Sequence, residues 1–278
     1  MQNQAHPKAT VIFLILLLGG VLFWTFSQWT NFSRPSMDLL LMQLEEGDVE
    51  DKLQALGVLS SQAFNKITPE HAKYKEHLLT ALEKLLHHTN TGVRAGALYL
   101  LTALPWLEVR TLLNRYKQKL IEWLQNEDAR LRRAAAAALA ELGAKTQAGV
   151  EELLGALVDE NPLVRSSAAR ALGRIGAEAE RVVPALIAAI KDPNPMTRHA
   201  AICALGDFGQ EAAAALPALA EVVRENSGQA TVYAAQALGA IGVSSDLSLE
   251  TLRRAAAAKE EELRRTAKEA LRRLKAQP

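Results

Sequence analysis

The sequence predicts an all-α fold built as a solenoid of stacked helical hairpins, and two repeating patterns support this. One pattern is a motif that returns every 33 residues without a gap, and one of its positions holds Arg132, Arg165, Arg198, Thr231 and Arg264. The other is a ladder of leucines with the same step, at Leu120, Leu153, Leu186, Leu219 and Leu252. A fixed period between 20 and 50 residues is the signature of a repeat array.

Each repeat contains two helices. In the second helix the apolar residues follow helical spacing, so they lie on one face, at Val164, Ala168, Ala171, Leu172 and Ile175. Glycine follows at the predicted helix end. The leucine ladder marks another helix upstream, so each unit is an antiparallel pair. One pair cannot bury its apolar face alone, whereas stacked pairs share a continuous core.

The motif in residues 159–176 reads DENPLVRSSAARALGRIG. It resembles HEAT repeats, in particular the short, alanine-rich kind found in phycobilisome-lyase-like proteins. The resemblance is strong over residues 120–275 and weak before them. It implies a right-handed α-solenoid of about seven HEAT-like helical hairpins, but it says little about function, because one fold serves many functions.

The same resemblance implies a structural ladder along the stack. In HEAT repeats of this kind, the motif arginine points inward and bonds to an aspartate in a turn between helices. The donors would be Arg94, Arg132, Arg165, Arg198 and Arg264. The acceptors would be Asn126, Asp159, Asp192 and Glu225, with no acceptor at Ala258.

Composition excludes some classes of function. The chain has 32 basic and 31 acidic residues, and this net charge of +1 gives no reason to expect a nucleic-acid partner. Hydrophobic residues make up 49% of the chain and aromatic residues only 5%, which suits closely packed helices. The single cysteine, Cys203, excludes an intramolecular disulfide.

Near the N-terminus, residues 9–29 form an uncharged apolar stretch after a polar tail, residues 1–8. As a helix these 21 residues would be about 30 Å long, enough to cross a bilayer. Trp24 and Trp29 lie at its far end, where an aromatic belt would contact the membrane interface. We therefore predict a transmembrane signal anchor.

Two alternatives to the anchor stay open. A cleaved signal peptide has a similar basic start and apolar core, although no good cleavage site follows here. A buried helix is the other alternative. The basic N-terminal region favours an N-inside orientation. The expected location is therefore a bacterial inner membrane, crossed once, with the solenoid on the periplasmic side.

A linker, residues 30–36, precedes the predicted solenoid, residues 37–278, whose period becomes regular from about residue 120. Ser36 is a candidate helix cap. Before residue 126 we predict helices over residues 37–46, 49–64, 69–88, 91–104 and 105–125, and the last helix of the chain covers 260–275. The step from Arg94 to Arg132 is 38 residues, and the five extra residues fall within the helix over 105–125.

No catalytic signature is present, and no cofactor or metal site is predicted. The paired glycines, such as Gly173 with Gly176, recur as helix punctuation rather than as a phosphate loop. His199, Cys203 and Asp207 follow one another at four-residue steps, so they share a helix face. They could form a thiol–imidazole nucleophile or a ligand cluster, but a mixed polar groove is the favoured interpretation.

If the second helix of each pair lines the concave surface, four positions per repeat face it, those of Ser166, Ser167, Arg170 and Arg174. From these positions we select the following candidate partner-binding residues: Arg133, Arg170, Arg174, His199, Cys203, Asp207, Tyr233, Gln236, Arg265, Glu269 and Arg273. The basic C-terminal helices are diluted by glutamates, which favours a salt-bridged helix surface over a nucleic-acid site.

The predicted function is that of a non-enzymatic, membrane-tethered scaffold or adaptor. Its solenoid groove would bind a protein partner, such as a subunit of a membrane complex, and the anchor would raise the partner's local concentration. One alternative is a bilin-lyase-like or other ligand-handling protein, which the family resemblance suggests. A second alternative is a soluble, secreted solenoid released by signal cleavage.

Overall fold

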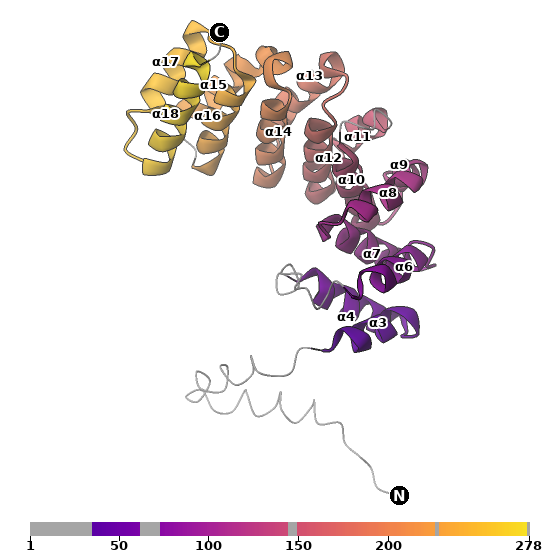
Figure 1. Ribbon diagram of the computed structural model, residues 1–278. Helices are drawn as coiled ribbons and strands as arrows, with labels where there is room; N and C mark the ends of the chain where they lie inside the picture. The colour runs from indigo at the N-terminus through magenta and orange to yellow at the C-terminus, as the bar shows by residue number, and fades with distance from the viewer. Residues whose placement is uncertain (1–34, 62–72, 144–148, 226–227, 277–278) are drawn as a thin grey trace, which may run out of the picture.

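The computed structural model describes residues 35–61, 73–143, 149–225 and 228–276. Over these residues the chain forms fifteen α-helices, one 3₁₀ segment and no strand. The helices follow one another as seven pairs, which agrees with the predicted all-helical solenoid. Figure 1 shows the pairs along an arc, with one helix of each pair on its concave side.

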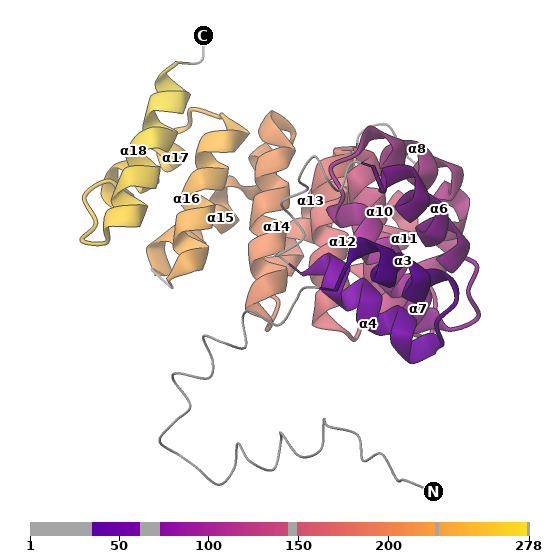
Figure 2. The same cartoon turned by 60° about the horizontal axis from the view of Figure 1, so that its bottom comes forward.

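The inner helices form a continuous row, because each one packs against the inner helix of the next pair. Figure 2 shows the later members of this row side by side, with their outer partners behind them. The row consists of α4 (Val49–Ser60), α7 (Thr91–Ala103), α10 (Ala129–Leu142), α12 (Pro162–Ile175), α14 (Pro195–Asp207), α16 (Gln229–Ile241) and α18 (Glu261–Lys275).

The outer helices lie on the convex side of the arc (Figure 1). They are α3 (Met37–Glu45), α6 (Lys75–Leu85), α8 (Leu107–Arg115) with α9 (Lys117–Trp123), α11 (Val150–Ala156), α13 (Ala179–Ala189), α15 (Leu216–Glu225) and α17 (Asp246–Ala255). The 3₁₀ segment η2 (Gly209–Ala215) directly precedes α15. The five leucines of the predicted ladder are each 0% exposed, as the repeat pattern requires: Leu120, Leu153, Leu186, Leu219 and Leu252.

Side chains with an acceptor oxygen start most of the inner helices. Asn161 and Asn194 accept from the backbone N–H two residues on, and a proline follows each of them at the first helical position. Asn90 also caps α7, accepting from the N–H of Val93, and Asp128 caps α10, accepting from the N–H of Arg130. Each such cap stabilises its helix by about 1 kcal/mol. The predicted cap of α3, Ser36, is also present, with its hydroxyl 3.2 Å from the N–H of Leu39.

The motif arginines clamp the turn inside each pair. In all five, Nη1 donates to two backbone carbonyls five and six residues earlier, at distances between 2.7 and 3.2 Å. These arginines are Arg94, Arg132, Arg165, Arg198 and Arg264. The carbonyls follow the outer helix, where no helical N–H is left to satisfy them, so the arginine joins the two helices of one pair.

The predicted bond to the next pair is present at two positions. Arg132 binds the carboxylate of Asp159, and Arg165 binds that of Asp192, each with an Nε–Oδ2 distance of 2.7 Å. Both carboxylates belong to the turn of the following repeat, so these bonds connect consecutive pairs.

The other two predicted acceptors are wrong. Among the described residues, no bond joins Arg94 to Asn126 or Arg198 to Glu225. Asn126 is neutral, and its side-chain oxygen accepts instead from the backbone N–H of Asp128 at 3.0 Å. Glu225 is the last residue of α15 and is exposed.

In the glycine pairs Gly173/Gly176 and Gly239/Gly242, the first glycine is a packing site rather than helix punctuation. A Cβ added at Gly173 would lie 2.7 Å from the Cα and Cβ of Ala204, and one at Gly239 would lie 2.6 Å from the Cβ of Ala270. Glycine therefore lets consecutive inner helices approach closely. The second glycine does end the helix: Gly176 has φ 60°, in the left-handed region.

Several predicted helix boundaries need correction. The helix predicted over 105–125 is two helices, because the backbone at Tyr116 leaves the helical region with φ −91° and ψ 4°. The helix predicted over 69–88 begins at Lys75 and ends at Leu85. The helix predicted over 49–64 ends at Ser60, since Ser61 is extended.

The predicted membrane anchor, residues 9–29 with Trp24 and Trp29, lies outside the described residues. In the part of the chain that the structure does describe, every helix is too short or too polar to cross a membrane. The anchor therefore stays a prediction from sequence.

Candidate functional site

The concave groove is the surface formed by the exposed side chains of the inner helices. All eleven predicted partner-binding residues are exposed or half-buried there. However, the prediction that four positions per repeat face the groove overestimates the number of side chains that reach the surface. Ala134, Ala137 and Val232 occupy such positions but are buried. Small side chains at these places let neighbouring inner helices pack closely, so fewer side chains reach the surface.

The N-terminal part of the groove is mainly apolar. A hollow of about 340 Å³ lies between α4, α7 and α10, and its lining includes Leu53, Ala95 and Tyr99. The guanidinium of Arg133 stacks over the ring of Tyr99 at 4.8 Å and also donates to its hydroxyl. The prediction missed Tyr99 and Leu53. Aligning the repeats on Arg94 places Tyr99 at the Arg170 position, so extending the alignment to this earlier repeat would have found it.

The central part of the groove is polar. Arg174 on α12 forms an ion pair with Glu141 on α10, with an Nη1–Oε1 distance of 2.6 Å. Arg170 is exposed one turn earlier on α12. On the neighbouring helices, the rings of His199 and Tyr233 lie 5.0 Å apart, centre to centre, at 60°.

The chemistry of His199, Cys203 and Asp207 does not suit nucleophilic catalysis. Cys203 reaches the surface, but partial desolvation by its neighbours raises the pKa of its thiol, and the nearby Asp207 raises it further. Burial lowers the pKa of His199, and Arg198 adds to this effect. Burial also raises the pKa of Asp207, which Arg174 partly opposes. A reactive cysteine needs a depressed pKa, so this thiol stays protonated at neutral pH.

The contacts agree with this view. Within the described residues no hydrogen bond joins His199 to Cys203. The same residues include no group of three or more His, Cys, Asp or Glu side chains that could hold a metal ion.

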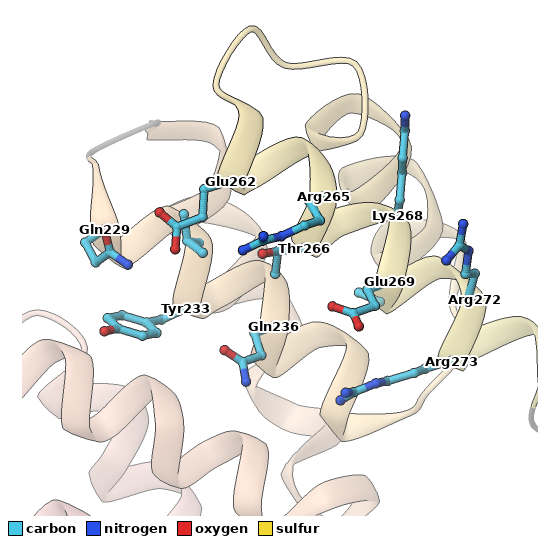
Figure 3. A pocket seen from close by; sticks show the side chains of 12 residues that line it. Gln229, Tyr233, Gln236, Glu262, Arg265, Thr266, Lys268, Glu269, Arg272 and Arg273 are labelled. Atoms are coloured by element: carbon cyan, nitrogen blue, oxygen red, sulfur yellow. The ribbon is translucent and has the colours of Figure 1, made fainter.

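The C-terminal part of the groove is hollowed. A cavity of about 720 Å³ lies between α16 and α18, and we call it the C-terminal hollow. Figure 3 shows the side chains that line it. They include five predicted groove residues: Tyr233, Gln236, Arg265, Glu269 and Arg273. Repeat spacing alone could not show that these residues enclose a cavity, because that depends on the angle between the two helices.

Comparisons with solved structures show the type of fold. One engineered protein aligns with a TM-score of 0.62 and 20% identity, covering 87% of this chain and 68% of that one. A second engineered protein aligns with a TM-score of 0.56 and 21% identity, covering 70% of this chain and 95% of that one. A designed armadillo repeat protein, solved in complex with the peptide (KR)4, aligns with a TM-score of 0.50 and 19% identity, covering 84% and 98%. The fold is therefore that of an all-helical repeat solenoid.

The family comparison identifies the repeats. Residues 117–181 and 177–233 match the family model described as HEAT repeats. This part of the chain consists of HEAT repeats, as predicted. The search of curated proteins found no match. The phycobilisome-lyase-like subtype stays a prediction.

Proposed function

We propose that this protein is a non-enzymatic scaffold that binds a protein partner through the concave groove. The observation that supports this most is the groove itself, where inner helices from successive pairs present exposed polar and charged side chains on one continuous surface. Repeat solenoids of this kind are typical interaction scaffolds, because their stacked units create extended concave surfaces. The designed armadillo neighbour was solved with a bound peptide.

The chemistry of the groove supports a binding role over catalysis. Its one thiol, Cys203, has a raised pKa. Two of its cations are already engaged by protein groups, Arg174 by Glu141 and Arg133 by Tyr99. Such contacts hold the side chains in place for recognition without activating a nucleophile.

The proposal includes a membrane tether formed by residues 9–29, and it rests on the sequence alone. The linker over residues 30–36 spans at most about 25 Å when fully extended. Since α3 begins at Met37, the solenoid would stay close to the bilayer. We propose an inner-membrane location with the solenoid in the periplasm and a membrane-associated protein as partner.

Photo-crosslinking in cells tests both parts of the proposal. A photoreactive amino acid replaces Tyr233 in the groove, and a matched control carries it at Ala188. That residue lies on the exposed face of α13, on the convex side, together with Glu180 and Pro184. We expect one membrane or periplasmic protein to be captured from Tyr233 and not from Ala188.

Other results would contradict the proposal in distinct ways. Capture of cytoplasmic proteins alone would show that the topology is reversed. Equal capture from both positions would show that the groove has no special role. A coloured small molecule that copurifies with the protein would favour the ligand-handling alternative. The intact mass decides whether the N-terminal segment is cleaved.

A further inference from the structure

The C-terminal hollow holds cations that have no acidic partner. Four basic residues line it, Arg265, Lys268, Arg272 and Arg273, together with two acidic ones, Glu262 and Glu269. Among the described residues, none of these six side chains forms an ion pair. In the middle of the groove, by contrast, Arg174 is held by Glu141. The cations of the hollow are therefore available to an external partner.

Three of these side chains form a regular row along α18. Arg265, Glu269 and Arg273 are spaced by four residues, so they share one face of the helix. Figure 3 shows them pointing across the hollow toward the α16 side, while Lys268 and Arg272 point away from it at the rim. Successive members of the row are about 6 Å apart along the helix axis.

The two helices that form the hollow, α16 and α18, are held at a fixed separation. Gly239 on α16 lies so close to Ala270 on α18 that an added Cβ would be 2.6 Å from the alanine Cβ. This contact fixes the separation of the two helices at the level of the backbone. The row on α18 therefore faces Tyr233 and Gln236 across a distance that is set before any partner binds, which lowers the entropic cost of binding.

An extended peptide matches this row in spacing. In a strand, alternate side chains point to the same face and are about 6.6 Å apart. Three alternate side chains of a peptide that runs along α18 would therefore meet Arg265, Glu269 and Arg273 in turn. The charges of the row require an acidic, then a basic, then an acidic residue in the peptide.

Resting on the proposed scaffold function, we propose that the C-terminal hollow binds an extended partner segment with the pattern acidic–x–basic–x–acidic. The two carboxylates pair with Arg265 and Arg273, and the basic residue pairs with Glu269. The pattern is symmetric, so either chain direction satisfies it. Tyr233 and Gln236 form the opposite wall, where an aromatic ring and an amide contact the intervening residues and the backbone.

The same charges argue against a nucleic acid as occupant. Glu262 and Glu269 would repel a phosphate backbone inside the hollow. Tyr233 is the one aromatic side chain in the lining, whereas binding of single strands relies on several stacking platforms. A segment with charges of both signs fits the alternating row better than a uniform polyanion does.

Fluorescence anisotropy with a labelled peptide tests the inference on the full-length protein. The probe contains Glu-Thr-Lys-Thr-Glu between Gly-Ser flanks, with both ends blocked. The comparison peptide, Lys-Thr-Glu-Thr-Glu, has the same composition and net charge in another order. We expect the probe to bind about fivefold or more tightly than the permuted peptide, since two exposed ion pairs are exchanged for like-charge contacts.

Variants of the row give a sharper test. The double substitution Arg265→Glu with Arg273→Glu should weaken binding of the probe by about tenfold or more. The matched control is Arg253→Glu with Lys275→Glu, which makes the same change in net charge at exposed positions outside the hollow. The control should keep the affinity. Circular dichroism verifies that all variants remain helical.

A charge swap distinguishes register from general attraction. In Glu269→Lys the preference should change to Glu-Thr-Glu-Thr-Glu, because the middle position now requires an acid. Equal affinity for the probe and the permuted peptide would overturn the inference, as would an equal loss in the control variant. Tighter binding of a labelled single-stranded oligonucleotide at the same site would also overturn it.

The peptide-binding experiments and the crosslinking experiment test the two proposals separately. If crosslinking from Tyr233 captures a protein while the probe peptide does not bind, the groove is a docking surface and the charge pattern inferred here is wrong. If the peptide binds but no protein is captured in cells, the hollow recognises this chemistry and the scaffold proposal lacks its partner.

Discussion

Replacement of Arg165 by alanine tests whether the repeats are joined by the arginine–aspartate contacts. The guanidinium binds both carboxylate oxygens of Asp192, at 2.7 and 2.9 Å. It also binds the carbonyls of Asp159 and Glu160, at 2.8 and 3.1 Å. The side chains of Arg165 and Asp192 are only 14% and 10% exposed. Removal of the arginine would leave a largely buried carboxylate and two carbonyls without their donor.

The expected cost follows from these contacts. Loss of one partner of a buried ion pair costs about 3–5 kcal/mol. The matched control is Arg198→Ala, because Arg198 makes the same two carbonyl contacts but no bond to a carboxylate. Its loss should cost less than the loss of Arg165, because it removes the two carbonyl contacts but leaves no buried carboxylate without its cation.

Urea unfolding followed by circular dichroism measures both variants, and hydrogen exchange in the turn over 157–161 locates the effect. The pH dependence is a further readout. The hydrogen bond from Arg165 is the main cause that lowers the pKa of Asp192 in the folded state. The carboxylate therefore stabilises the fold at a pH above its unfolded pKa of about 3.9, and this stabilisation is lost as the pH falls through the lowered folded pKa.

In Arg165→Ala this acid-dependent loss should be smaller, because Asp192 has lost the hydrogen bond that lowers its pKa in the folded state, so protonation of Asp192 removes less stabilisation. Equal destabilisation by Arg165→Ala and Arg198→Ala would refute the reasoning. It would show that the arginine stabilises the fold through its bonds to the carbonyls within one pair rather than through the contact between pairs.

Three further predictions concern packing, thiol chemistry and the membrane. Gly239→Ala should destabilise the fold by about 1–3 kcal/mol through overpacking against α18, measured by urea unfolding. The control is Gly155→Ala, where the added methyl group would meet no neighbouring atom, and it should be neutral or stabilising by up to about 1 kcal/mol. Cys203 should react slowly with iodoacetamide at pH 7 because its thiol pKa is raised. Asp207→Asn should speed the reaction by removing a nearby negative charge. An unchanged rate would show that the carboxylate has no influence on the pKa of the thiol. Deletion of residues 9–29 should release the protein from membranes under alkaline carbonate extraction, and release of the intact chain would contradict the anchor.

Parts of the site could be predicted because the period maps sequence onto surface position. Once one repeat is aligned, Arg170, Cys203, Gln236 and Glu269 occupy equivalent places, and all four are exposed. The same rule fails at Ala137, which is buried, because the alanine-rich α10 packs closely between α7 and α12. Exposure at a repeat position depends on the neighbouring helix as well as on the period.

The sequence by itself determined the regular helix pairs after about residue 120, the buried leucine ladder and the arginine position, because each follows from a fixed step along the chain. Only the tertiary structure decided which arginines reach a carboxylate. Arg165 and Arg198 look equivalent in sequence, yet only Arg165 has a short acidic side chain within reach in the next turn. The structure also showed that Gly239 sets the distance between α16 and α18, and hence the width of the C-terminal hollow. Distances between side chains on neighbouring helices depend on how closely and at what angle the backbones cross, and a repeat pattern along one chain does not contain that information.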